Sequence, residues 1–151
     1  MLYISAKKSE LIPSESFLCS NGCIEIIIGG VNIHYQAINL KEKLSKFNDY
    51  WSLRVIGEMN NNQFKLIKIV GEYVWHVHEE ADKVFMVLEG EMIIDFRDGQ
   101  VKISKGEMFI VPKGIEMKPF AEKECHIMLV EPKSVVNNGG TESESTAAND
   151  I

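Results

Sequence analysis

The sequence is poor in arginine and has no long apolar run. Only two of its sixteen basic residues are arginines, Arg54 and Arg97, and the formal net charge is −6. Binding of nucleic acid needs a concentrated basic face, and a phosphate clamp is commonly built from arginine guanidinium groups, so we expect neither. No apolar segment approaches the roughly 18 residues that are needed to cross a bilayer. We therefore expect no nucleic-acid partner and no membrane partner.

Cysteine is also scarce. The three cysteines, Cys19, Cys23 and Cys125, are odd in number and lack the spacing of a disulfide framework. Cys19 and Cys23 could offer two thiolates to zinc, but no second Cys or His pair follows at a suitable spacing. The N-terminal residues do not show the charged, apolar and small-residue regions of a signal peptide. We expect free thiols and a cytoplasmic location.

The composition divides the 151 residues into an N-terminal arm (1–33), one barrel domain (34–136) and a flexible C-terminal tail (137–151). In the arm, the apolar run at 24–28 ends at two glycines and predicts a strand that is added to a sheet edge or used in dimerisation. The tail is rich in Asn, Gly, Ser, Thr and Glu, which is typical of a mobile segment.

Short strands are predicted from residue 51 onward. Segments rich in Val, Ile and Phe recur about every ten residues, and each is closed by a turn signal. Met92, Ile94 and Phe96 alternate with Glu91, Asp95 and Arg97, as in a half-buried antiparallel strand. Asp98-Gly99 then offers a tight hairpin turn. About eight such strands, preceded by one short helix at 40–44, predict an all-β sandwich or barrel.

Two histidines, His76 and His78, lie where an apolar segment ends and a run of carboxylates begins. Side chains alternate along a strand, so residues two apart point the same way and the two imidazoles would converge. Imidazole and carboxylate are the donors that divalent zinc, iron and manganese accept. The pair therefore predicts a metal site or a polar pocket.

Two glycine-framed segments resemble the two motifs of the cupin superfamily. The first, Gly71 to Gly90, is GEYVWHVHEEADKVFMVLEG, and the second, Gly106 to Met117, is GEMFIVPKGIEM. With their flanking strands they cover about residues 50–132, and they resemble small single-domain bacterial cupins described as mannose-6-phosphate isomerase-like. The resemblance implies a double-stranded β-helix, that is, a jelly-roll (RmlC-like) barrel with its site inside, commonly as a homodimer.

The metal-ligand positions of the motifs are only partly retained. His76 and His78 match the two histidines of the first motif, but Lys83 stands at the glutamate position and Met117 at the position of the last histidine. An ammonium group has no lone pair to give, and its charge repels a dication. The resemblance thus implies a degenerate or rearranged site, with zinc, iron, manganese or nickel bound weakly or not at all. A rearranged site would need another carboxylate, from Glu80, Asp82 or Glu116.

Lys83 and Met117 each leave alternatives open. Lys83 either pairs with nearby carboxylates at the barrel rim or lies inside, beside the imidazoles, as a positive group for a carboxylate, phosphate or sugar acid. Met117 either fills the core, lines the ligand pocket or acts as a soft ligand for Cu(I).

Three hypotheses about function follow. The first is a cupin that binds a small anionic or sugar-like ligand at Lys83 and Met117, with a degenerate metal site at His76 and His78. The second is a metal-dependent enzyme, either a sugar isomerase or epimerase or a dioxygenase. The third is a metal-free dimeric interaction protein that uses its arm. The sequence does not identify the substrate.

Overall fold

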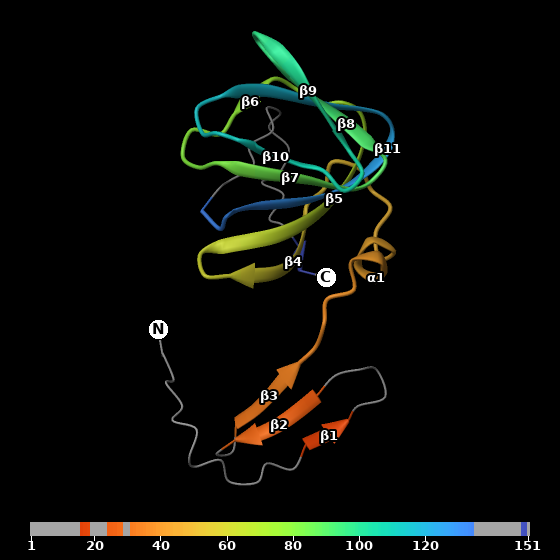
Figure 1. Ribbon diagram of the computed structural model, residues 1–151, viewed down its shortest axis with the longest axis vertical. Helices are drawn as coiled ribbons and strands as arrows, with labels where there is room; N and C mark the ends of the chain where they lie inside the picture. Colours follow the sequence, from red (N-terminus) through yellow and green to blue (C-terminus); the bar gives the residue numbers. More distant parts are fainter. Residues whose placement is uncertain (1–15, 19–23, 29–30, 135–148, 151) are drawn as a thin grey trace. The chain divides into compact units, whose positions relative to one another are not determined.

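The computed structural model describes residues 16–18, 24–28, 31–134 and 149–150 (Figure 1). The chain divides into two units, Met1–Asn39 and Leu40–Ile151. In the first unit, three antiparallel strands form a sheet in the order β1-β2-β3: β1 (Ser16–Leu18), β2 (Ile24–Ile28) and β3 (Val31–Tyr35). The strand predicted at 24–28 is therefore confirmed, but it is the middle strand of this sheet and not an edge strand. Cys19, Cys23 and residues 137–148 of the predicted tail lie outside the described residues.

The second unit has one short helix followed by strands. They are α1 (Leu40–Leu44), β4 (Arg54–Met59), β5 (Asn62–Glu72), β6 (His76–Val77), β7 (Lys83–Glu89), β8 (Glu91–Phe96), β9 (Gly99–Ser104), β10 (Met108–Val111), β11 (Glu116–Pro132) and β12 (Asn149–Asp150). The predicted helix and the eight strands β4 to β11 are confirmed, so the unit is all-β with one short helix. β12 is a short parallel addition beside β4.

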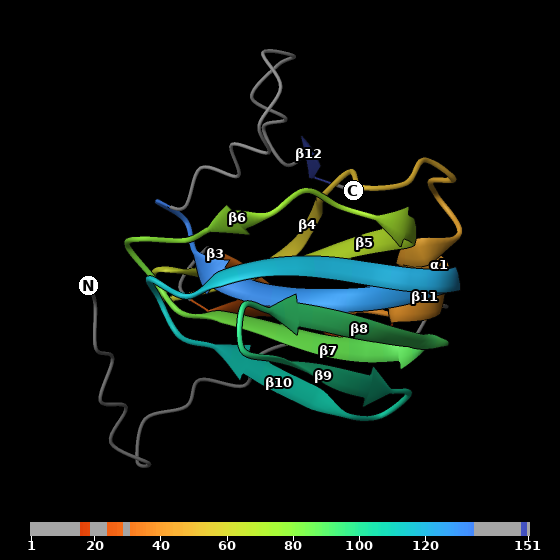
Figure 2. The same cartoon turned by 90° about the horizontal axis from the view of Figure 1, so that it is seen from above.

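Strand β11 joins the two halves of the barrel. Residues 116–120 pair with β6 and β8, and residues 126–130 pair with β7. Strand β5 pairs with residues 120–121 and again with residues 125–132. The register of β11 on β5 shifts between Ala121 and Cys125. The strand order is β10-β7-β11-β5-β4-β12, while β8 pairs with β11 and β9 pairs with β8 (Figures 1 and 2). The strands thus enclose one interior as a jelly-roll barrel, as the sequence predicted.

Alternation along the strands fills this interior with apolar side chains. Ile67 and Ile69 of β5 lie opposite Ile127 and Cys125 of β11, and all four are buried. Each fully buried aliphatic side chain of this kind stabilises the fold by about 1.5–3 kcal/mol. The main buried cluster consists of Leu53, Ile67, Ile69, Phe85, Val87, Met92, Ile94, Ile103, Val111, Met117, Ala121, Cys125, Ile127 and Leu129.

A second, smaller cluster lies on the outer face of the sheet. It contains Phe47, Ile56 and Leu66, and Leu40 and Leu44 of α1 pack against it. The helix therefore covers one end of the outer face with the side that carries Leu40 and Leu44.

Gly90, which closes the first motif, makes the tight turn from β7 to β8. Its φ is +80°, and a Cβ atom there would lie 2.8 Å from the backbone oxygen of Glu124. A side chain would meet both the left-handed backbone and this carbonyl, so the position requires glycine.

Candidate ligand site inside the barrel

The two histidines lie side by side, His76 on β6 and His78 directly after it. This strand pairs with the start of β11, where Met117 lies opposite His76. Val77 between the histidines is 38% exposed, whereas His76 and His78 are half-buried. Their ring centroids are 5.0 Å apart with the planes at 87°. The two imidazoles are thus in edge-to-face contact, as alternation along a strand predicts.

Two aromatic side chains, Tyr73 and Trp51, pack in sequence against the His76 ring. The Tyr73 ring meets the His76 ring edge-on at 5.2 Å, and Trp51 stacks on Tyr73 at 5.0 Å. Trp51 has a φ of 60°, which is rare for a bulky residue, and its indole N–H donates to Val70 O at 3.0 Å. His76 Nδ1 donates to Val74 O at 2.9 Å, which leaves Nε2 with the lone pair.

A turn from the second motif fixes the segment that carries the histidines. The Gly114 N–H donates to His78 O at 2.8 Å, and the Lys113 N–H donates to the Asp82 carboxylate at 2.9 Å. Gly114 has a φ of +75°, a conformation that favours glycine. The two motifs therefore meet at this turn, which fixes the backbone of His78 and the side chain of Asp82.

Lys83 lies inside the barrel and not at its rim. It is 5% exposed, and its Nζ lies 3.4 Å from His78 Nε2 and 3.0 Å from Glu131 Oε2. Of the two positions that the sequence allowed for Lys83, the structure has the inner one. The ion pair with Glu131 was not foreseen.

Lys65 and Glu131 complete a buried charge cluster that the sequence analysis missed. Lys65 Nζ lies 2.7 Å from Glu131 Oε1, and the two residues are 3% and 1% exposed. Lys65 is in phase with the inward residues of β5, and Glu131 is in phase with those of β11. The register of β7 on β11, with Val84 opposite Val130, brings Lys83 next to Glu131. Charged residues at inward positions of three strands were the available signal.

The protonation states follow from this burial. Burial, the charge of Lys83 and the neighbouring His76 lower the pKa of His78 to about 4, although Glu131 opposes the shift. Burial also lowers the pKa of His76. Burial and Lys65 lower the pKa of Lys83, against the opposing attraction of Glu131. At neutral pH both imidazoles are therefore uncharged and can accept or donate hydrogen bonds.

Met117 is fully buried. Its exposure is 0%, and it belongs to the main hydrophobic cluster. It lies opposite Phe96 on one side and His76 on the other. Its thioether thus fills the core directly beneath the first histidine.

The donor set does not fit a divalent metal centre. The lone pair of His78 Nε2 faces the Lys83 ammonium, which competes with a cation for it and repels the cation. The carboxylates proposed for a rearranged site are partly engaged elsewhere, since Asp82 binds a backbone N–H and Glu116 binds Arg97 at 2.7 and 3.0 Å. Among the described residues, no group of three or more His, Cys, Asp or Glu side chains is placed to hold a metal ion.

Comparison with known proteins identifies the family to which the chain belongs. Residues 68–131 match the cupin domain family. A solved cupin-2 domain protein of Shewanella frigidimarina is 53% identical, with a TM-score of 0.63 over 64% of this chain and 94% of that one. A solved protein of Neisseria meningitidis is 39% identical, with a TM-score of 0.60 over 65% of this chain and 100% of that one. The chain therefore belongs to the cupin superfamily, whose members often bind divalent metals.

Curated relatives give less about activity. The uncharacterised protein YdbB of Bacillus subtilis is 38% identical over 79 residues, which are 52% of this chain and 64% of the length of YdbB. The acireductone dioxygenase of Puccinia graminis is 28% identical over 137 residues, which cover 70% of this chain and 75% of the enzyme. In the described part of the chain, no helix is long and apolar enough to cross a membrane.

Proposed function

We propose that this cupin binds a small anionic ligand, such as a carboxylate, a phosphate or a sugar acid, inside its barrel. The observation that carries the proposal is the charge of the inner cluster. Lys65 and Lys83 share the single carboxylate of Glu131, so these three buried residues carry one more positive than negative charge. A buried net charge is costly, and an anion beside Lys83 would balance it.

The histidines suit the same ligand. His76 and His78 are uncharged at neutral pH, and their rings lie together as a polar wall. Neutral imidazoles can bind the hydroxyl groups of a sugar acid or the oxygens of a carboxylate. We propose that Lys83 supplies the charge recognition, that the histidines orient the ligand and that Met117 forms the apolar floor.

Calorimetric titration with a small panel tests this proposal. The probes are inorganic phosphate, citrate and galacturonate in low-salt buffer, with galactose as the uncharged control. We expect at least one anion to bind, and Lys83→Met to weaken it at least tenfold. Lys102→Met removes an exposed lysine that pairs with Glu91, and it should leave the affinity unchanged. Absence of binding by every anion, or equal binding by Lys83→Met, contradicts the proposal.

A metal-dependent enzyme is the second candidate. The similarity to acireductone dioxygenase favours it, whereas the ammonium beside His78 opposes it. Elemental analysis of the purified protein separates the two candidates. We expect well below one equivalent of zinc, iron, manganese or nickel, unchanged in the double variant His76→Ala, His78→Ala. One equivalent that is lost in this variant would favour the enzyme.

We also propose that the protein forms a homodimer and acts in the cytoplasm, where a buried thiol such as that of Cys125 stays reduced. The homodimer is supported by an apolar outer face on β10, β7 and β11. Two cross-strand rows run over it, Met108–Met86–Met128 and Ile110–Val84–Val130. Met108 and Ile110 are 57% and 48% exposed. An apolar row that stays open to water is a typical site for a second copy.

A further inference from the structure

An open pocket of about 590 Å³ lies between α1 and the outer face of the sheet. Its apolar wall comes from Leu40, Leu44 and Leu88, and its polar wall includes Lys68 and His126. The volume is within the range of small-molecule sites, about 300–1,000 Å³. The pocket is separate from the inner site, because Lys65 of the same strand points into the barrel while Lys68 points out.

The register of three neighbouring strands places the polar residues of this wall side by side. His126 of β11 lies opposite Lys68 of β5 and opposite Glu89 of β7, so the three form one cross-strand row. The register shifts between His126 and Ile127, and this irregularity brings Leu88 to the pocket beside Glu89. The helix then supplies the opposite, aliphatic wall.

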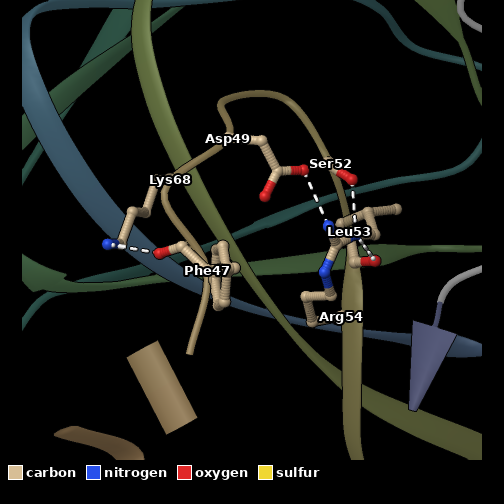
Figure 3. A network of polar contacts seen from close by, with 6 residues as sticks. All are labelled: Phe47, Asp49, Ser52, Leu53, Arg54 and Lys68. Carbon is tan, nitrogen blue, oxygen red and sulfur yellow. Dashed lines mark hydrogen bonds and ion pairs between the residues drawn. The ribbon is translucent and has the colours of Figure 1, made fainter. Parts of the chain in front are cut away.

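Lys68 is the unusual member of the row. It is only 8% exposed, and its Nζ donates to Phe47 O at 2.8 Å and lies 5.2 Å from the centre of the Phe47 ring (Figure 3). In the part of the chain that the structure describes, no carboxylate lies within 4.0 Å of this ammonium. A carbonyl and a ring face offset only part of the cost of a buried charge.

The surrounding groups hold Phe47 in place and leave the pocket positive. Arg54 lies 5.5 Å from the Phe47 ring centre and is anchored by Asp49 at 2.7 Å (Figure 3). Glu89 is neutralised by Lys105 at 2.7 Å. Among the lining residues the remaining charges are therefore positive, on Lys68 and Lys41. Just outside the lining, the Glu124 carboxylate binds His126 at 2.7 Å and Tyr50 at 2.6 Å, and it also interacts electrostatically with Lys68.

We infer that this pocket is a second binding site, for a small amphipathic anion whose carboxylate pairs with Lys68 and whose aliphatic body lies against Leu40, Leu44 and Leu88. A carboxylate would form the direct ion pair that Lys68 lacks among the described residues, where Glu124 acts on it only from beyond 4.0 Å. Charge-assisted hydrogen bonds are about twice as strong as neutral ones. The aliphatic wall would remove the methylene groups of the ligand from water, which is favourable for each group buried. The site is independent of the ligand inside the barrel.

Titration of the ¹⁵N-labelled protein with hexanoate, followed by NMR, tests this inference. 1-Hexanol serves as the probe with the tail alone and acetate as the probe with the charge alone. We expect hexanoate to bind at least tenfold more tightly than either, with amide shifts at Leu44, Lys68 and Leu88. Equal affinity for hexanoate and 1-hexanol, or hexanoate shifts centred on His78, would overturn the inference.

Two variants distinguish the contribution of the Lys68 charge to binding from that of the cavity. Lys68→Met keeps the aliphatic stem, and it should weaken hexanoate at least tenfold while leaving 1-hexanol unchanged. Ser45→Trp fills the pocket from its exposed edge, retains Lys68, and should abolish binding of both probes. Lys83→Met should leave hexanoate binding unchanged, which distinguishes this site from the inner one. Unaltered hexanoate affinity in Ser45→Trp, or its loss in Lys83→Met, would refute the second site.

Discussion

The inner charge cluster predicts that removing its carboxylate and removing one of its lysines have very different costs. Glu131→Gln leaves the two ammonium groups of Lys65 and Lys83 buried together without a negative charge. Lys83→Met leaves one ammonium and one carboxylate, which balance, and adds an apolar chain of similar length. The two substitutions therefore change the net charge of the same cluster in opposite directions.

The magnitudes follow from this difference. Breaking a buried ion pair by removing one partner costs about 3–5 kcal/mol because a charge is left uncompensated. We expect a loss of this size for Glu131→Gln. Lys83→Met should lie within about 1 kcal/mol of the wild type, because replacement of a buried charge by an apolar group is often neutral or stabilising. For a chain of this size, 1 kcal/mol corresponds to about 2–4 °C in the melting temperature.

Urea denaturation followed by circular dichroism measures both free energies of unfolding. Glu116→Gln is the matched control, because the same substitution there breaks the exposed Arg97–Glu116 pair, whose carboxylate side chain is 42% exposed. An exposed pair is worth about 0–1 kcal/mol. If Lys83→Met destabilised the protein as much as Glu131→Gln, the cluster would not carry excess positive charge and the reasoning would be refuted.

Three further predictions concern the turn, the histidines and the outer face. Gly90→Ala should lower the free energy of unfolding by about 1–3 kcal/mol, because the backbone is left-handed there and a Cβ would meet a carbonyl at 2.8 Å; unchanged urea midpoints would argue against this. The folded-state pKa of His78, about 4, is below its usual 6.5, so the folded protein binds fewer protons and stability should fall as the pH drops from 6.5 towards 4. Because His78 is half-exposed, solvent screening reduces this loss of stability to about 1–2 kcal/mol. The variant His78→Phe should not lose this stability between pH 6.5 and 4. An identical pH dependence in both proteins would contradict the lowered pKa of His78. The double variant Met108→Lys, Ile110→Lys should be a monomer in analytical ultracentrifugation where the wild type is a dimer, and a monomeric wild type would remove the proposed interface.

Much of the fold could be predicted because it depends on local patterns. The short helix at 40–44, the strand at 24–28 and the hairpin after Phe96 each have a signature in a few adjacent residues. The buried positions of Met92 and Ile94 follow from simple alternation. The glycine frame of the two motifs then selected the jelly roll from other all-β folds.

The site could be predicted only in part, because its charge balance depends on contacts distant in sequence. The convergence of His76 and His78 is local, but Glu131 is 48 positions from Lys83 and meets it only through the register of β7 on β11. Lys65 is one of several lysines in strands, and only the phase of β5 places it inside the barrel. The outer pocket was missed for the same reason, since Lys68 and His126 become neighbours only when β5 pairs with β11.

The most direct test of the central claim is the electron density at the point where His76, His78 and Lys83 meet. Crystals should be grown from protein purified without a metal-affinity step, with diffraction data collected at the iron, nickel and zinc edges. We expect Lys83 beside His78 with an anion or water bound to it, and no anomalous peak. An anomalous peak about 2.0–2.1 Å from both imidazoles, with Lys83 turned away, would contradict the claim that the pocket recognises an anion in place of a metal.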